Sequence, residues 1–183
     1  MMELSAVELE AVKYPIGKSP ILGSFTLEEI KKNIERISVM PVALMKLSSE
    51  IKKEDYKYSY RPNGWNIAQI LHHLADSHIN MYIRVKFALT EENPAIKPYD
   101  ENLWAVMPDA ISGEDAHVSV LIVSGIHHRL SVLLSSLTEE QLYRTVFHPQ
   151  RNSNISIADM CALYAWHGEH HIAQIKVAIE KRF

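Results

Sequence analysis

Long runs of apolar residues at helical spacing are the feature that most limits what this chain can fold into. Isoleucine, leucine and valine recur every three or four positions over four long segments, which is the spacing of one face of an α-helix. No segment shows a convincing alternation of apolar and polar residues, as a half-buried strand would. We therefore expect one all-α domain over residues 1–183, built as a four-helix bundle.

Capping and helix-breaking residues indicate where the four helices begin and end. They are predicted over about residues 27–52, from Asn66 to beyond Val85, over about 115–137, and from Ser156 almost to Phe183. Thr26 and Glu29 form a capping box before the first helix. Pro41 lies inside that helix and should kink it, because proline lacks a backbone donor and crowds the preceding turn.

The segments between these helices are expected to be irregular. Prolines and glycines punctuate residues 1–24, which indicates an irregular N-terminal arm. Residues 90–110 hold three prolines and no sustained period, so a long loop is predicted between the second and third helices. A connection of this length is usually functional or mobile. A short helical turn is expected at residues 138–142, followed by a polar break at 147–154.

Composition excludes several classes of function. The net charge of −3 and pI near 6.4 give no electrostatic footprint for nucleic acid or an anionic membrane. We expect no apolar stretch near the ~18 residues that span a bilayer, and the acidic N-terminus is unlike a signal peptide. The single cysteine, Cys161, suits a reducing compartment. A cytoplasmic protein without nucleic-acid or membrane partners is expected, and its unusual feature is ten histidines.

Two histidines of the last helix share its apolar face. His167 and His171 are one helical turn apart, so their side chains lie about 40° from each other in projection, and His170 lies at the edge of the same stripe. One interpretation is that both are core histidines satisfied by hydrogen bonds, but each would then need partners in an apolar interior. Coordination of one metal ion would satisfy both, and H-x-x-x-H is a recurrent metal-binding pair.

The second helix offers the third ligand. It carries His72, His73 and His78. The helical projection places His78 within the apolar stripe and His73 beside it, while His72 points away. Spacing alone therefore leaves two candidates, His73 and His78, and favours the second of them.

The remaining histidines are weaker candidates. His127 and His128 are adjacent on the third helix and diverge by about 100°, so they cannot both face one site and at least one is expected to be solvated. His117 and His148 lie near predicted helix ends or loops, where a surface position is expected.

Four segments closely resemble the YfiT branch of the DinB family, a group of metal-dependent hydrolases. They are RPNGWNIAQILHHLADSHINMYIRVKFALTEENPAIKPYDENLW, LYAWHGEHHIAQI, YPIGK and LSSLTEEQLYRTVFHP, and the resemblance covers about residues 13–176. It implies a four-helix bundle with a long connection between the second and third helices. It also implies a homodimer in the cytoplasm.

The resemblance further implies which histidines hold the metal. In that family one ligand follows a tryptophan by eight residues and directly precedes leucine, and an H-x-x-x-H pair on the fourth helix supplies the others. On this sequence the first ligand is His73, counted from Trp65, and the pair is His167 and His171. This choice differs from the helical projection, which favours His78.

Three neutral imidazoles leave a divalent ion open to water or substrate. Such a site lowers the pKa of bound water to ~7. Nitrogen ligands suit zinc, with nickel as a competitor. Asp76 and Glu169 are candidates for hydrogen bonds to the ligand imidazoles. No general base is evident, although the side chains of Tyr82, Arg84 and Trp104 are placed where they can approach the pocket.

Three hypotheses of function remain, each with a small-molecule substrate or ligand. The first is a metal-dependent hydrolase that uses a metal-activated water. The second is a metal-assisted transferase or isomerase that uses a low-molecular-weight thiol of the bacillithiol type, as relatives in the wider family do. Cys161 points away from the histidine stripe and is not expected to be that thiol. The third is a bundle that binds a metal without catalysis.

Overall fold

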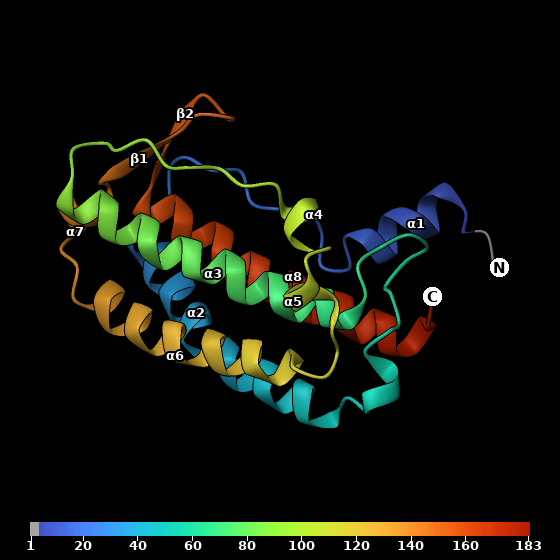
Figure 1. Cartoon of the computed structure of the whole chain (residues 1–183). Helices are drawn as coiled ribbons and strands as arrows, with labels where there is room; N and C mark the ends of the chain where they lie inside the picture. Colours follow the sequence, from blue (N-terminus) through green and yellow to red (C-terminus); the bar gives the residue numbers. More distant parts are fainter. Residues whose placement is uncertain (1–3) are drawn as a thin grey trace.

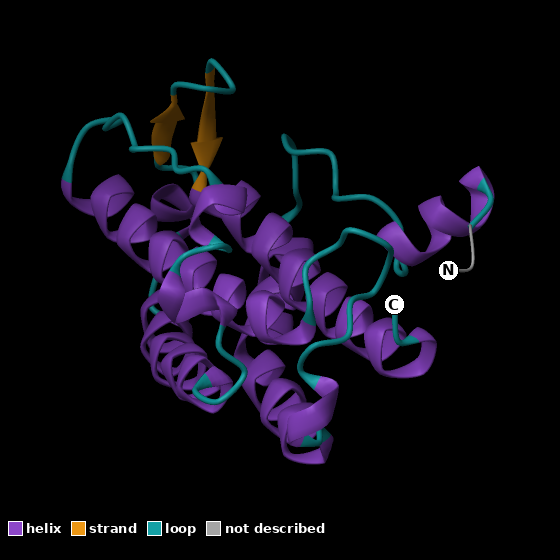
Figure 2. Ribbon diagram, turned by 45° about the vertical axis from the view of Figure 1, so that its right-hand side comes forward, coloured by secondary structure: helices purple, strands orange, loops and turns teal. Residues whose placement is uncertain are grey.

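The computed structural model describes residues 4–183 and shows a four-helix bundle with short elements at its ends (Figures 1 and 2). The bundle helices are α2 (Leu27–Glu50), α3 (Ile67–Thr90), α6 (Ala116–Ser135) and α8 (Ile157–Lys181). The all-α class and the bundle predicted from the apolar periodicity are confirmed.

The order of the helices in space explains the long connection in the middle of the chain. In Figure 1, α2 and α8 run in one direction and α3 and α6 in the other. Both α2 and α3 pack mainly against α6 and α8. Because α3 and α6 are parallel neighbours, the chain must return along the bundle between them, and residues 91–115 make this crossover. The crossover carries α4 (Glu101–Trp104) and α5 (Pro108–Ile111), two short helices within the predicted loop.

Each bundle helix except α6 begins with a capping box. Thr26 and Glu29 cap α2 as predicted, Asn66 and Gln69 cap α3, and Ser156 and Asp159 cap α8. The helix α2 continues through Pro41, so this proline does not divide the helix. The predicted boundaries therefore hold to within a few residues.

The N-terminal arm is more regular than predicted. Residues Ala6–Lys13 form a helix, α1, where an irregular segment was expected. Ser5 and Glu8 form its capping box, and the helix contacts α8. None of its residues is buried, so it lacks the apolar stripe on which the helix prediction depends.

A β-hairpin replaces part of the predicted polar break. Strands β1 (Thr145–His148) and β2 (Ser153–Ser156) pair antiparallel, with Val146 opposite Ile155. Both of these apolar side chains are buried. Strands of four residues are too short to show a clear alternation in the sequence. The remaining short elements are a 3₁₀ turn, η1 (Lys53–Asp55), and α7 (Glu139–Leu142), which lies at the predicted helical turn.

The buried apolar residues form two clusters, one toward each end of the bundle. A belt of buried polar residues lies between them. On α3 the belt holds Ser77 and His78, and on α6 it holds His127. On α8 it holds His170 and His171, with the half-buried His167 one turn before His171, between the two apolar stretches of that helix. At the middle of the bundle, α3, α6 and α8 therefore meet through histidines rather than aliphatic side chains.

The helix α6 is the most apolar of the bundle helices. By length and composition it is long and apolar enough to cross a membrane, with a mean hydropathy of 1.5, which differs from the expectation that no stretch approaches this limit. A third of that stretch is buried, against α2 and α3. A core helix of a bundle has the same composition, so this feature is weak evidence for a membrane span.

Candidate metal centre

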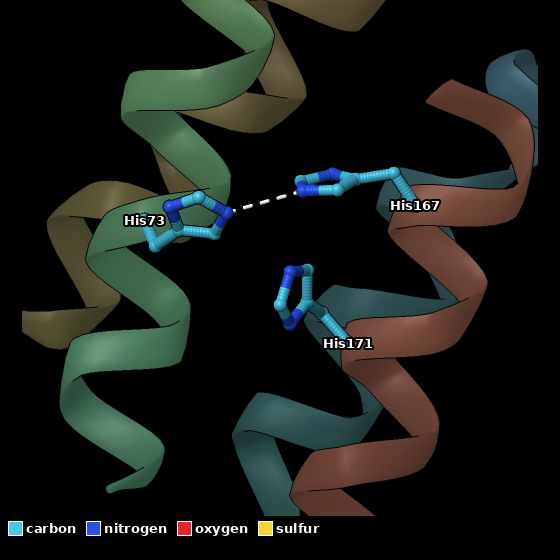
Figure 3. A group of neighbouring side chains, drawn as sticks. All are labelled: His73, His167 and His171. Carbon is cyan, nitrogen blue, oxygen red and sulfur yellow. Dashed lines mark hydrogen bonds between the residues drawn. The ribbon is translucent and has the colours of Figure 1, made fainter. Parts of the chain in front are cut away.

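Three histidines converge at the middle of the bundle. His73 projects from α3, and His167 and His171 project toward it from α8 (Figure 3). One ring nitrogen of each lies within 4.8 Å of the other two, and the Nε2 atoms of His73 and His167 are 3.1 Å apart. Ligands of a tetrahedral zinc ion, at ~2.0–2.1 Å from the metal, lie roughly 3.3 Å from one another. We call these three residues the histidine triad, and the separation of His73 and His167 is already close to this spacing.

The histidine triad is shielded on one side by an aromatic ring. Trp65 lies just before the start of α3, and its ring centroid is 4.7 Å from that of His73 and 6.4 Å from that of His171. His73 and His171 are only 5% and 7% exposed. The tryptophan thus limits how far bulk water reaches the imidazoles of His73 and His171.

Burial keeps the histidine triad uncharged. It lowers the pKa of His73 to about 4, and it lowers the pKa of His167 and His171 well below the usual value, because a charged imidazole loses its hydration there. At neutral pH all three side chains are neutral. The neutral imidazole is the form that coordinates a metal ion, so no proton must be removed from a charged ring before binding.

The orientation of His171 is set by an amide. Nδ1 of His171 lies 2.9 Å from Oε1 of Gln174, and the amide nitrogen of Gln174 donates to the carbonyl of Lys13 at 3.0 Å. Since Lys13 takes the amide donor, Gln174 presents its oxygen to His171 and accepts the N–H at Nδ1. Nε2 of His171 is left as the acceptor that faces the triad. The sequence analysis missed Gln174, although its position three residues after His171 on one helix face was a usable signal.

His78, the ligand that the helical projection favoured, lies outside the triad. Its Nε2 atom is 3.2 Å from Nδ1 of His167, on the side of that ring away from His73. It therefore contacts a member of the triad from behind. The projection was right that His78 is buried but could not separate a residue within the site from one that supports it.

Two other histidines differ from their predicted positions. His72, expected to point away, is buried, with ring nitrogens 2.8 Å from Oγ of Ser119 and 3.0 Å from the carbonyl of Ser112. It was misplaced because α3 is covered on most of its circumference, here by α6 and the crossover. His148, expected at the surface, lines the cavity described below.

The adjacent histidines of α6 agree with the prediction that at least one of them is solvated. His127 is buried and His128 is exposed, and His117 is exposed as expected.

The two carboxylates considered as hydrogen-bond partners of the triad histidines, Asp76 and Glu169, do not contact them. Glu169 instead accepts two hydrogen bonds from Arg36, from Nε at 2.8 Å and from Nη2 at 2.6 Å. Asp76 is half-buried, and no hydrogen bond joins its carboxylate to the histidine triad in the described part of the chain, residues 4–183. The supporting partners of the triad are therefore neutral groups.

A cavity of about 480 Å³ opens onto the histidine triad. The crossover supplies part of its wall through Pro98, Tyr99 and Glu101. Trp166 and His170 also line it, and their Nε1 and Nδ1 atoms are buried with no hydrogen-bond partner among residues 4–183. A bound molecule or water can satisfy these two groups.

The cavity carries more positive than negative charge. Lys18, Arg84 and Arg151 line it, against one carboxylate, that of Glu101. Arg84 donates to the hydroxyl of Tyr164 at 3.2 Å. No carboxylate in residues 4–183 forms an ion pair with Arg84. This end of the cavity is suited to a negatively charged group.

Three side chains named in the sequence analysis lie away from the cavity wall. Tyr82 is buried in one of the apolar clusters, and Trp104 packs on Tyr99 with a centroid distance of 4.3 Å. Cys161 is fully buried, and burial raises the pKa of its thiol to about 12. Of the three cavity candidates from the sequence, only Arg84 reaches it.

Residues 37–175 match the model of the DinB superfamily. The chain belongs to this superfamily. A protein of Oceanobacillus iheyensis named "Putative metal-dependent hydrolase" is 42% identical over 163 residues, which cover 89% of this chain and 93% of that protein. YfiT of Bacillus subtilis, which is also named "Putative metal-dependent hydrolase", is 38% identical over 164 residues, which cover 90% of this chain and 92% of YfiT.

Two solved structures share the fold of this DinB superfamily member. The structure of Bacillus subtilis YfiT superposes with a TM-score of 0.88 at 36% identity, covering 93% of this chain and 97% of that chain, and is described as having an unusual four-helix bundle topology. A mycothiol-dependent maleylpyruvate isomerase superposes with a TM-score of 0.63 at 14% identity, covering 83% and 63%. The second likeness concerns the fold alone.

Proposed function

We propose that this chain is a metal-dependent hydrolase of small molecules, with one divalent ion held by His73, His167 and His171. The observation that carries the proposal is the triad itself, in which three neutral ring nitrogens lie within 4.8 Å of one another at the wall of a cavity. In the described part of the chain no carboxylate or thiolate joins this group as a fourth ligand. Three protein ligands with an open position are typical of catalytic zinc sites, whereas structural sites have four.

When bound, the ion would lower the pKa of a coordinated water to ~7, so that a nucleophile is available at neutral pH. The protein residues have distinct tasks around it. Trp65 shields the triad from bulk water. Gln174 holds the ring of His171 with its Nε2 atom toward the site. Three nitrogen donors favour zinc, with nickel as the competitor.

The charge of the cavity supports a substrate that carries an anionic group. Arg84 is half-buried, and a cation in that setting is stabilised by an anion placed beside it. We propose that Arg84 binds a carboxylate or phosphate of the substrate, held in place by its hydrogen bond to Tyr164. The expected result is a lower KM for acidic esters than for neutral esters of equal size. Equal KM values for acidic and neutral esters in the wild type would contradict this role of Arg84 and leave the hydrolysis itself untouched. In Arg84→Gln the difference in KM is expected to disappear while kcat stays unchanged.

The second candidate function is transfer or isomerisation with a low-molecular-weight thiol. One observation favours it: Glu101 is the one carboxylate among the residues that line the cavity, and burial lowers the pKa of the lining histidines His148 and His170, so a strong general base for water is scarce. A thiol, with a pKa near 8.5, needs less help than water to become a nucleophile beside a metal ion. The isomerase that shares this fold is named as mycothiol-dependent. The thiol would come from outside the chain, since Cys161 is buried away from the cavity.

One pair of assays tests both functions. Zinc-loaded protein is incubated with a panel of small esters and amides, and separately with bacillithiol and an electrophile. We expect hydrolysis that is lost on chelation, restored by zinc and absent in His167→Ala. Thiol transfer without hydrolysis would replace the first function by the second. Failure of both reactions in protein that binds zinc would leave a metal-binding bundle without catalysis.

We also propose a homodimer located in the cytoplasm. The neighbouring helices α2 and α6 expose apolar side chains that a partner copy would cover, among them Val39, Val42, Leu121 and Val132. The free thiol of Cys161 suits a reducing compartment. Sedimentation equilibrium is expected to give twice the chain mass, and Leu121→Glu is expected to shift it toward the monomer. A wild-type monomer at micromolar concentration would contradict the dimer.

A further inference from the structure

Two more histidines continue from the triad into the interior. Nδ1 of His167 lies 3.2 Å from Nε2 of His78, and Nδ1 of His78 lies 2.7 Å from Nε2 of His127. Nδ1 of His127 lies 2.7 Å from the backbone carbonyl of Ile37. Three imidazoles from α8, α3 and α6 thus form an unbroken chain that ends on the backbone of α2. We call His78 and His127 the relay pair.

The carbonyl at the end of this chain is available because of Pro41. In an α-helix the carbonyl of residue 37 accepts from the N–H of residue 41, and proline has none. The carbonyl of Ile37 lies inside the bundle, where an unpaired acceptor is costly. His127 supplies the missing donor. Pro41 therefore creates an acceptor at a fixed place in the core, and α2 continues past it.

The relay pair is neutral. His78 and His127 are 0% and 1% exposed, and the groups that hydrogen-bond to them are imidazoles and a carbonyl. A charged imidazole buried without a carboxylate would lose its hydration with no compensating partner. Each ring therefore has one N–H donor and one acceptor nitrogen.

With neutral rings, the direction of every hydrogen bond in the chain follows from its end. The carbonyl of Ile37 can only accept, so Nδ1 of His127 carries the proton and Nε2 is an acceptor. Nδ1 of His78 must then donate to His127, which leaves Nε2 of His78 as an acceptor. Nδ1 of His167 must in turn donate to His78. The lone pair of His167 Nε2 is thereby directed into the triad.

We propose that the relay pair consists of positioning residues that fix the tautomer and ring orientation of His167 for metal binding. The Ile37 carbonyl accepts the first hydrogen bond and thereby sets the donor and acceptor nitrogens of the three imidazoles that follow, on three helices. This inference rests on the metal site proposed above. It assigns a role to two buried histidines that touch neither the cavity nor the ion's expected position. Ligating histidines usually donate their second N–H to an outer partner, and loss of that partner typically weakens metal binding 10–100-fold.

A relay of neutral rings differs in effect from a carboxylate partner. A carboxylate behind a ligating imidazole raises the basicity of the ligand. A neutral imidazole holds the same orientation without adding negative charge to the site. The bound ion would keep more of its positive charge, which favours polarisation of a substrate or a water.

The test compares zinc affinity across matched variants. Competition with a chromogenic chelator is expected to show 10–100-fold weaker binding in His78→Leu. His78→Gln, whose amide oxygen can accept from His167, is expected to recover most of this loss. His72→Leu is the control, because it removes an equally buried histidine of the same helix that belongs to no metal-linked chain. Equal affinities in His78→Leu and His72→Leu would overturn the proposal.

A spectroscopic measurement on metal-free wild type tests the same hydrogen-bond chain and does not depend on whether His78→Leu folds. Long-range ¹H–¹⁵N spectra of imidazole-labelled protein near pH 7.5 are expected to show protons on Nδ1 of both His78 and His127. A proton on Nε2 of either ring would overturn the relay. Wild-type protein that shows these tautomers but does not bind zinc would instead contradict the proposed metal site, so the two failures are distinguishable.

Discussion

Two neighbouring members of the histidine triad on α8, His167 and His171, are oriented by different regions of the molecule. His171 is held from the outside, through one amide, by a carbonyl at the end of α1. His167 is held from the inside, through two imidazoles, by a carbonyl in the middle of α2. Both hydrogen-bond chains end on a backbone carbonyl. Only the inner one needs a proline, because Pro41 lacks the N–H that would otherwise occupy the Ile37 carbonyl within α2.

The difference shows what a bundle interior requires of a polar site. At the end of α1 the carbonyl of Lys13 has no intrahelical partner, as is general for the last turn of a helix. Inside the bundle every carbonyl is normally bonded within its helix. A buried ligand must therefore be supported by side chains that satisfy one another, and neutral imidazoles do so because each offers one donor and one acceptor.

The largest expected effect is the removal of one of the proposed ligands. His171→Ala or His167→Ala takes away one of three protein donors, so zinc affinity should fall by more than the 10–100-fold typical of an outer partner. Any metal-dependent activity should be lost with it. Isothermal titration with zinc measures this fall, and binding within a factor of three of wild type would remove that residue from the site.

The two hydrogen-bond chains, the inner one behind His167 and the outer one behind His171, can then be compared directly. His78→Leu leaves two buried ring nitrogens without partners, whereas Gln174→Leu leaves one ring nitrogen and a carbonyl near the surface. Both variants should weaken zinc binding within the 10–100-fold range, and His78→Leu should lose more. A greater loss in Gln174→Leu would reverse the order of importance of the two chains.

Acid should destabilise the metal-free protein from pH 6.5 downward. The pKa of His73 is lowered to about 4, and those of His78, His167 and His171 are lowered too, all by burial first. Between an unfolded pKa of ~6.5 and the folded value, the unfolded chain binds more protons, so stability falls as pH falls through this window. Each such histidine contributes a slope approaching ~1.4 kcal/mol per pH unit.

Urea unfolding of the metal-free protein at several pH values between 7.5 and about 4.5 measures this slope. Zinc should oppose the loss at the upper end of the range, since it binds the folded state. A free energy of unfolding that is constant or rises on acidification would show that these histidines are not buried as neutral groups.

Pro41→Ala tests the origin of the inner chain with a smaller effect. The variant returns a backbone N–H to the carbonyl of Ile37, which must then be shared with His127. The fold should be kept, zinc affinity should fall less than in His78→Leu, and the Nδ1 proton of His127 should show a weaker hydrogen bond by NMR. An unchanged resonance for that proton would separate Pro41 from the relay.

The smallest effect is expected outside both chains. Glu169 lies two residues from each of two triad members, yet its carboxylate is paired with Arg36, and their side chains are 43% and 33% exposed. Glu169→Gln should cost no more than ~1 kcal/mol of stability and leave zinc affinity unchanged. A tenfold loss of zinc affinity would mean that a carboxylate supports the triad after all.

The sequence predicts the helices well and their contacts less well. Apolar periodicity and the Thr26, Asn66 and Ser156 caps locate the four bundle helices, because both signals are local. The hairpin at residues 145–156 and the helix α1 were missed. The strands of the hairpin are too short to show an alternation of apolar and polar residues, and α1 has no buried face.

The site shows the same limit. The spacing of His167 and His171 on one helix face is readable from the sequence, whereas α3 is covered on most sides and its projection could not rank His73 against His78. The bond from His127 to Ile37 joins residues 90 positions apart, and the one local sign of it is Pro41. Pro41 indicates that the carbonyl of Ile37 lacks its helical hydrogen bond, but it does not indicate which residue donates to that carbonyl instead.

Zinc-edge X-ray absorption on the loaded protein tests the central claim most directly. We predict one ion per chain with three imidazole nitrogens at ~2.0–2.1 Å, at least one further oxygen from solvent, and no sulfur. The imidazole signal should fall by one in His73→Ala. A site with fewer than three imidazoles, or an ion that His73→Ala leaves undisturbed, would contradict a metal centre shared between α3 and α8.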